Sequence, residues 1–339
     1  MSDTKPLAQE SYSPLEDIVT GYIKTQMLYV AAKLGIAEHL SEGPKSSEAL
    51  AKAVGAHPQA LYRLLRALEN LGLFSEPEPG IFVLTPLGTD LKKDSPSRVC
   101  TQVIFNVELF WRIWGELAYS VTTGRPATEH VYGVPFFDHL KQHTEQASIF
   151  NEDMTRFITT MAPAVVAAYD FGRFNIIVDI GGGHGTLMAT ILQANHHTRG
   201  VIFDLPVTVE GAQKRMSELG LGNRCRCVGG DFFAEVPVGD AIILSAIISD
   251  WDDEKSVRIL TNCRRSIAPD GRLLLLERLL IPDEPAPPTA ILDLAMFVMG
   301  GGTGRTEREY RSLLAKSGFE LLRVVQTGTQ RSIFEAEPM

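Results

Sequence analysis

The spacing of apolar and polar residues changes character about halfway along the chain. In the first part, apolar residues recur at helical spacing, as Leu61, Leu65 and Leu68 do on one face of a predicted helix. After residue 175, short apolar runs alternate with amphipathic segments, a pattern typical of parallel strands joined by helices. The pattern therefore predicts a helical domain over 1–165 and an α/β domain over 166–339.

The first part also carries the signals of a small domain with a hairpin. Helices are predicted over 13–40, from Ser46-Ser47 and from His57-Pro58, and two apolar runs at 71–74 and 81–84 flank the turn residues 77–80. Helices followed by a two-stranded wing form a winged-helix pattern. Residues 98–170 are expected to form further helices, rich in bulky apolar side chains.

Seven apolar runs in the second part predict the strands of a doubly wound sheet. They lie at 176–180, 200–203, 225–228, 241–247, 272–280, 320–326 and 333–336, and the last two are expected to pair as a hairpin.

Charge and hydropathy limit the partners of the chain. Its 339 residues are 45% hydrophobic, enough for two packed cores, and carry a formal net charge of −9. Residues 1–95 hold 9 Lys and Arg against 12 Asp and Glu, whereas a winged helix that contacts phosphates needs the opposite balance. No apolar run approaches the ~18 residues of a membrane span, and the polar start does not resemble a signal peptide. We expect neither nucleic acid nor a membrane as the main partner.

The residues that could bind a metal do not predict a metal site. The four cysteines include no CxxC pair, and they are expected to be thiols of a cytoplasmic protein. His139 and His143 lie one helical turn apart and are expected on a solvated helix face.

The run of glycines after the first strand of the second part predicts a cofactor site. The strand 176–180 leads into Gly181-Gly182-Gly183-His184-Gly185, and a helix is expected from Leu187 to Leu192. Glycines let a backbone turn tightly and approach a ligand, and the N–H groups at the start of a helix face that ligand.

Acidic residues after the next two strands indicate which cofactor binds. Thr186 stands where a dinucleotide fingerprint has its third glycine. Asp204 can accept hydrogen bonds from ribose hydroxyls, Asp231 from an adenine amino group, and Phe232 can pack on the ring. The glycine loop contains no Lys or Arg, so a nucleoside without phosphates fits better than a pyrophosphate. S-adenosylmethionine meets that description.

Over nearly its whole length the chain resembles the plant caffeic-acid-type and bacterial O-methyltransferases. The resemblance rests on the winged-helix start and on the segments 150–154, 178–183, 203–206, 230–232, 250–254, 276–277 and 305–306. It implies a Rossmann-like domain that binds S-adenosylmethionine, releases S-adenosylhomocysteine and acts on a small aromatic molecule, and an N-terminal domain that forms a homodimer.

The resemblance also assigns residues to the two ligands. Those implied to hold the cofactor are Gly181, Gly183, Asp204, Leu205, Asp231, Phe232, Ser245 and Trp251. Those implied to line the substrate site are Trp111, Trp114, Phe150, Met154, Met296, Phe297 and Met299, although each of these apolar residues could equally belong to the core.

The chain departs from the family at the catalytic positions. The family's general base is a histidine directly before the Asp-Trp pair, and here that residue is Ser249. In the family a carboxylate before the Arg-Thr pair usually orients that histidine, and here Gly304 occupies its position. Glu277 keeps the family's carboxylate and could orient a polar substrate group, or pair with Arg278 or Arg305. Ser249 and Glu277 are therefore the candidate catalytic residues. Asp250 is expected in a turn, or as the cap of a helix over 252–264.

The loss of the histidine affects which substrates the chain can methylate. A phenol of pKa ~10 needs about 4 kcal/mol of help at pH 7, which a serine hydroxyl cannot supply. A ring nitrogen or amine already presents a lone pair, and alignment alone can contribute roughly 7–11 kcal/mol to the transfer. The segment 244–250 is similar to bacterial phenazine N-methyltransferases, which also lack the histidine.

Three hypotheses follow. The first is methyl transfer to nitrogen or to an acidic hydroxyl of an aromatic or heteroaromatic natural product, by proximity and orientation. The second is a methyltransferase-like enzyme that uses the cofactor structurally for hydroxylation or a pericyclic reaction. The third is a winged-helix regulator, which the acidic N-terminal part disfavours.

Overall fold

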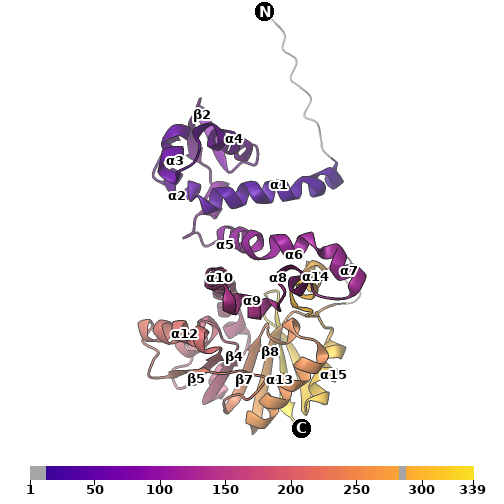
Figure 1. Ribbon diagram of the computed structural model, residues 1–339. Coiled ribbons are helices and arrows are strands. Elements are labelled where there is room, and N and C mark those ends of the chain that lie inside the picture. Colours follow the sequence, from indigo (N-terminus) through magenta and orange to yellow (C-terminus); the bar gives the residue numbers. More distant parts are fainter. Residues whose placement is uncertain (1–12, 282–287) are drawn as a thin grey trace, which may run out of the picture. The chain divides into compact units, whose positions relative to one another are not determined.

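A computed structural model describes residues 13–281 and 288–339 and divides the chain into two compact units (Figure 1). The division falls between Glu108 and Leu109. The domain boundary predicted near residue 165 instead lies inside a long helix, because the helices that precede it pack on the α/β part.

The first unit is a helical domain with a small three-stranded sheet. Its elements are α1 (Pro14–Lys33), α2 (Ile36–Ser41), β1 (Lys45–Ser46), α3 (Ser47–Val54), α4 (Pro58–Glu69), β2 (Phe74–Glu78), β3 (Ile81–Leu84), the 3₁₀ turn η1 (Leu87–Leu91) and α5 (Val99–Phe105). The sheet has the order β1-β3-β2, with antiparallel pairs throughout.

Local sequence explains where these helices begin. Ser13 and Glu16 form a capping box at the start of α1, and the Ser46 side chain accepts the N–H of Ala49 at the start of α3. The predicted helix over 13–40 is two helices, because Gly35 adopts a left-handed conformation between α1 and α2. The predicted hairpin is present, but its first strand begins only at Phe74.

Several short helices and one long helix lead into the α/β part of the second unit. They are the π-helical turn η2 (Asn106–Phe110), α6 (Trp111–Gly115), α7 (Leu117–Thr123), α8 (Ala127–Tyr132), α9 (Phe136–Gln142), α10 (Thr144–Ala168) and the 3₁₀ turn η3 (Phe171–Arg173).

One of these helices corrects the prediction for a histidine pair. His139 is only 6% exposed, stacks between Tyr132 and His143, and bonds Gln146. The expectation of a solvated face is therefore wrong for His139, because its ring packs against neighbouring rings.

A seven-stranded sheet forms the centre of the second unit. Its strands are β4 (Ile176–Ile180), β5 (Arg199–Asp204), β6 (Cys225–Gly229), β7 (Gly239–Ser245), β8 (Ile267–Glu277), β9 (Phe319–Gln326) and β10 (Ser332–Pro338). Their order is β6-β5-β4-β7-β8-β10-β9. The five strands from β6 to β8 are parallel, and β10 is antiparallel to both of its neighbours.

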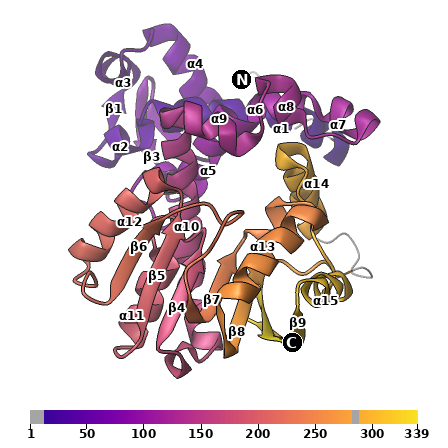
Figure 2. The same cartoon turned by 60° about the horizontal axis from the view of Figure 1, so that its bottom comes forward.

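Helices cover both faces of this sheet, as Figure 2 shows. The remaining elements are α11 (Thr186–Ala194), α12 (Pro206–Glu218), the 3₁₀ turn η4 (Ile248–Asp250), α13 (Asp253–Ser266), α14 (Pro288–Gly300) and α15 (Glu307–Lys316). One core layer joins α10, α11 and α12 to one face of the sheet, and a second joins α13 and α15 to the other. Strands β4 and β7 are buried between the two layers, which explains their continuous apolar runs.

The arrangement of parallel strands decides where a ligand can bind. The chain order reverses between β4 and β7, and the carboxyl ends of β4, β5, β6, β7 and β8 all meet at one edge of the sheet. In open α/β sheets ligands bind beyond that edge, at the point of reversal. The glycine loop after β4 lies there.

Candidate functional site

The glycine loop is held against the ends of two strands. The N–H of Gly181 donates to the carbonyl oxygen of Phe203 at 2.7 Å, which fixes the loop to the end of β5. Gly181 has a φ of 67°, and a Cβ atom there would lie 2.3 Å from the Ile247 side chain. Only glycine fits this position, because both its conformation and its surroundings exclude a side chain.

Asp204 connects the glycine loop to the end of β5. One carboxylate oxygen accepts the N–H of Gly183 at 2.9 Å, and the other accepts the N–H of Leu205 at 2.7 Å. Burial raises the pKa of this carboxyl group, while these backbone donors partly offset the shift. Each carboxylate oxygen has a second lone pair, so Asp204 can accept further hydrogen bonds from a ligand.

Asp179, at the penultimate position of β4, is a buried acid beneath the same loop. Gly182 passes so close that a Cβ atom there would lie 2.9 Å from the Asp179 carboxylate. Among the described residues, the Oδ1 atom of Asp179 has no hydrogen-bond partner, and burial, with the neighbouring charge of Asp204, raises the pKa of Asp179 to about 7. An unpaired buried carboxyl group beside a ligand loop is suited to a cationic ligand, because a positive charge would stabilise its ionised form.

Aromatic rings gather around the acid that follows β6. Asp231 is exposed, and one of its oxygens accepts the N–H of Phe233 at 2.8 Å. The ring of Trp251 lies 6.2 Å from Phe232 and 4.9 Å from Phe233, centroid to centroid. The structure thus brings together Asp231, Phe232 and Trp251, which the sequence analysis assigned to the adenine end of the cofactor. Flat rings beside a carboxylate suit a nucleobase with an amino group.

The loop after β7 is held by Glu277 at the end of β8. Its Oε1 atom accepts the N–H groups of Ile247, Ile248 and Ser249 at 3.1, 2.9 and 3.3 Å. The strand predicted to reach Ile247 is wrong at its end, because Ala246 takes a φ of 55° and the N–H groups after it turn to this carboxylate.

Glu277 is 1% exposed, and its surroundings explain its ionisation. Burial raises its pKa, while Arg331 and the backbone and hydroxyl of Ser249 lower it. Arg305, one partner considered for Glu277, instead forms an ion pair with Asp253 at 2.9 Å and donates to the carbonyl oxygen of Ile248. Arg278 donates to Gln330 at 3.1 Å. Glu277 therefore positions the loop that carries Ser249.

Arg331 brings a buried positive charge to this edge of the sheet. It directly precedes β10, whose first residue pairs with Glu277, and it is 7% exposed. Its guanidinium donates to the Ser245 hydroxyl at 3.3 Å and lies over the Phe157 ring, and its Nε atom has no partner in the part of the chain that the structure describes.

Ser249 and Asp250 end the turn η4 close to α14. The carbonyl oxygen of Ser249 accepts the N–H of Thr303 at 3.0 Å. Asp250 lies in the turn as predicted, but it does not cap the next helix. The cap is Asp252, whose side chain accepts the N–H of Lys255 at 2.8 Å. The Asp250 carboxyl group is left without a hydrogen bond to any described residue.

The residues predicted to contact the substrate lie on three helices of the second unit. Helix α14 contacts both α6 and the turn η4, and Phe150 on α10 joins Phe137, whose ring is 5.9 Å from Trp251. Their exposure differs: Trp111 is 37% exposed, Met299 is 5% exposed, and the others are half-buried, namely Trp114, Phe150, Met154, Met296 and Phe297. The burial of Met299 favours a role in the core.

Sequence reasoning missed three polar groups at this edge as site residues: Asp179, Asp250 and Arg331. An acid inside an otherwise apolar strand was a readable signal for Asp179. Nothing in the sequence near Arg331 indicates its position, because it reaches the site only through the pairing of β10 with β8.

The described residues contain neither a candidate membrane-spanning helix nor a candidate metal site. Within 13–281 and 288–339, no helix is both long and apolar enough to cross a lipid bilayer. Within the same ranges, no group of three or more His, Cys, Asp and Glu is arranged to hold a metal ion.

Comparison with known proteins identifies the family. Residues 114–320 match the O-methyltransferase domain, and residues 16–94 match the O-methyltransferase dimerisation domain. The chain belongs to the O-methyltransferase family. The predicted family, the Rossmann-like fold with an N-terminal dimerisation domain, and the methyltransferase class are thereby confirmed.

Its relatives include enzymes that methylate oxygen and enzymes that methylate nitrogen. The chain is 44% identical over 328 residues to a phenazine O-methyltransferase of Lysobacter antibioticus, covering 96% of each chain. It is 34% identical over 317 residues to a phenazine-1-carboxylate N-methyltransferase of Pseudomonas aeruginosa, covering 92% of each chain.

Solved structures extend the likeness to the whole fold. The mitomycin 7-O-methyltransferase matches with a TM-score of 0.92 at 36% identity, covering 96% of this chain and 97% of that one. An O-methyltransferase from neocarzinostatin biosynthesis, in complex with S-adenosylmethionine and a naphthoic acid, matches with a TM-score of 0.84 at 30% identity, covering 93% and 96%. The complex with S-adenosylmethionine confirms the predicted cofactor for the family.

Proposed function

We propose that this chain transfers the methyl group of S-adenosylmethionine to a nitrogen or an acidic hydroxyl of a small aromatic or heteroaromatic natural product. The observation that carries the proposal is that Asp204 bonds a glycine loop that has no Lys or Arg, while Asp231 follows the neighbouring strand β6. Two carboxylates repel a phosphate but accept hydrogen bonds from hydroxyl and amino groups of a nucleoside.

The residues of the site fit the cofactor at both ends. Asp204 would accept the ribose hydroxyls, and Asp231, Phe232 and Trp251 would surround the adenine. The unpaired oxygen of Asp179 supports a cationic ligand at the other end, beneath the glycine loop. When bound, S-adenosylmethionine supplies an electrophilic methyl group on a positively charged sulfur.

The protein's own contribution to the reaction is alignment and exclusion of water. The aromatic and methionine side chains of α6, α10 and α14 provide an apolar surface for a planar substrate, and η4 presents Ser249 and Asp250 beside them. Ser249 hydrogen bonds Glu277 and is not basic near neutrality, so it does not replace a histidine base. We assign to Glu277 the role of positioning the turn η4, which carries Ser249.

The test is transfer of label from methyl-labelled S-adenosylmethionine to a panel of hydroxyphenazines, phenazine carboxylic acids, quinones and flavonoids. We expect label in at least one heteroaromatic substrate, and mass spectrometry would locate it on nitrogen or oxygen. The absence of transfer to every member, with the cofactor bound, would contradict the proposal. Turnover that proceeds equally with S-adenosylhomocysteine would instead indicate a non-methylating reaction.

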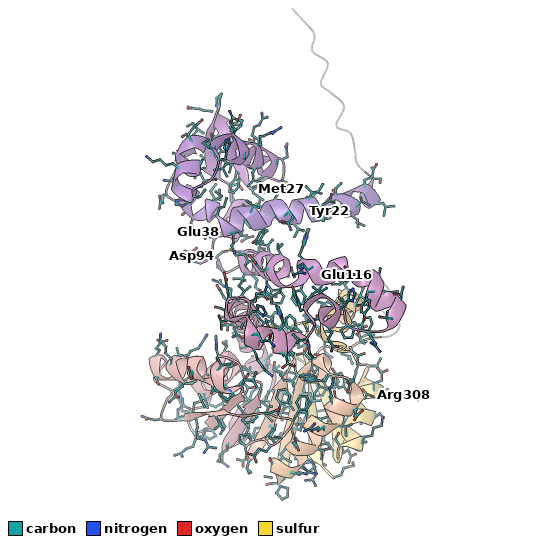
Figure 3. All side chains as sticks on the ribbon, viewed as in Figure 1. Tyr22, Met27, Glu38, Asp94, Glu116 and Arg308 are labelled. Carbon is teal, nitrogen blue, oxygen red and sulfur yellow. The ribbon has the colours of Figure 1, made fainter. Side chains whose placement is uncertain are left out.

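We further propose a homodimer formed through α1. This helix exposes a row of large apolar side chains, with Ile18 75% and Tyr22 59% exposed, and the dimerisation-domain match covers it. Tyr22 is labelled on α1 in Figure 3. Light scattering should give twice the 37.2 kDa of one chain. Ile18→Glu should yield the monomer, whereas Val207→Glu, at an exposed position on α12, should remain dimeric. A monomeric wild-type chain would contradict this proposal.

A cytoplasmic location without nucleic-acid or membrane partners also remains our inference. The four cysteines are free thiols, and the net charge of −9 supports it.

A further inference from the structure

The reaction on a hydroxyl group requires a proton acceptor, and the polar side chains at this edge of the sheet differ in their freedom to act as one. Ser249 is not basic, and the Oε1 atom of the buried Glu277 already accepts three backbone N–H groups. His184 lies within the glycine loop, where its ring contacts α12 and Thr155. None of these three is available to a substrate hydroxyl.

Asp250 is the side chain that remains. We propose, resting on the methyl transfer proposed above, that the Asp250 carboxylate accepts the proton of the substrate's hydroxyl group. It follows Ser249 directly, so a carboxylate one residue further along takes over the task of the missing histidine.

Three neighbouring acidic side chains are held by structural hydrogen bonds or ion pairs, whereas that of Asp250 is not held so by any described residue. Asp252 caps α13 through the N–H of Lys255, and Asp253 forms an ion pair with Arg305. Asp293, on the adjacent helix α14, accepts the N–H of Gly304 at 2.6 Å. Asp250 is half-buried and has no such structural bond among the described residues. A carboxyl group withdrawn from water without a structural partner is costly to the fold, which favours a role in the chemistry.

The charges that face Asp250 come from three sides. Glu277 lies at the end of β8, Arg331 directly before β10, and Arg305 donates to the carbonyl oxygens of Ile248 and Trp251 on either side of Asp250. Burial and the charge of Glu277 raise the pKa of Asp250 to about 8, while Arg331 lowers it. A base whose pKa lies near the working pH, and within about two units of a phenol, is well matched to general base catalysis.

Proton transfer to Asp250 accompanies transfer of the methyl group to the substrate oxygen. The hydroxyl proton passes to the Asp250 carboxylate as the substrate oxygen bonds to the methyl carbon. The carbon–sulfur bond breaks, and its electron pair neutralises the sulfonium to a thioether. Protonated Asp250 then releases its proton to water.

The decisive variant is Asp250→Asn, which keeps the shape but cannot accept the proton. With a hydroxyl substrate we expect kcat/KM to fall by about 10²–10⁴-fold. In the wild type, kcat/KM should rise with pH up to an inflection near 8, which the variant should lose. An amine or ring-nitrogen substrate needs no base, so its rate should be unchanged. Asp252→Asn is the matched control, because Asn also caps helices well and the activity should be retained.

Two further measurements make the test independent of folding and of turnover. Calorimetry should show the same affinity of Asp250→Asn for S-adenosylhomocysteine as in the wild type. In the ternary complex with that product, the absorbance of the bound phenolate should appear at a higher pH in the wild type than in the variant, because the negative charge of ionised Asp250 raises the pKa of a neighbouring phenol. Ser249→His in the Asp250→Asn background should restore transfer, with an inflection near the ordinary histidine value of ~6.5.

The outcomes distinguish this inference from the proposed function. If the wild type transfers the methyl group and Asp250→Asn does so with the same rate and pH profile, the role of Asp250 is overturned and the proposed function stands. No transfer by the wild type to any substrate would overturn both.

Discussion

Asp204→Ala should weaken the binding of S-adenosylmethionine and of S-adenosylhomocysteine by about 100-fold or more, since hydrogen bonds to a charged group contribute about 1.5–3 kcal/mol each. The variant would lose the ribose acceptor. It would also free the N–H groups of Gly183 and Leu205, so the glycine loop would keep only its backbone attachment to β5. Isothermal titration calorimetry with both ligands would measure the loss.

The control removes a charge without touching the site. Glu210 is exposed on α12, and Glu210→Ala should bind both ligands as the wild type does. Asp204→Asn retains the volume and one acceptor oxygen, so its affinity should lie between those of the wild type and Asp204→Ala. Unchanged affinity in a folded Asp204→Ala variant would exclude Asp204 from the cofactor site.

Glu277→Ala should lower the free energy of unfolding by about 3–5 kcal/mol, because it would leave buried backbone donors and a buried positive charge without the negative charge that offsets them. Three backbone N–H groups would lose their acceptor, and the guanidinium of Arg331 would lose a nearby negative charge. Urea unfolding followed by circular dichroism would measure the change. Glu320→Ala, at an exposed position on β9, should leave the unfolding free energy unchanged.

A double-mutant cycle tests the coupling between Glu277 and Arg331. Combining Glu277→Ala with Arg331→Met removes both charges, so the double variant should be more stable than the sum of the two single losses implies. Strict additivity would show that the two groups do not interact. Glu277→Gln keeps an acceptor oxygen for η4 and should keep a pH inflection from Asp250, moved to lower pH because the charge of Glu277 that raises the pKa of Asp250 is removed.

The repeating part of the fold was largely predictable from sequence. Strands β4, β5 and β6 lie within one residue of the runs that predicted them, because each is a short apolar segment bounded by turn residues. The ends of β2 and β7 were predicted less well. Ile247 is as apolar as the strand before it, and the end of β7 depends on a carboxylate 30 residues further along the chain.

The sequence by itself determined the family, the parallel sheet, the glycine loop and the acids that follow β5 and β6, because these features depend on local spacing and on strands ending at one edge. Only the tertiary structure decided the surroundings of Glu277, Asp250 and Arg331. Arg331 meets Ser245 across 86 positions of sequence, and the carboxylate of Glu277 reaches back to η4. Burial and neighbouring charge set the proton affinity of such groups, and both arise only when distant segments pack together.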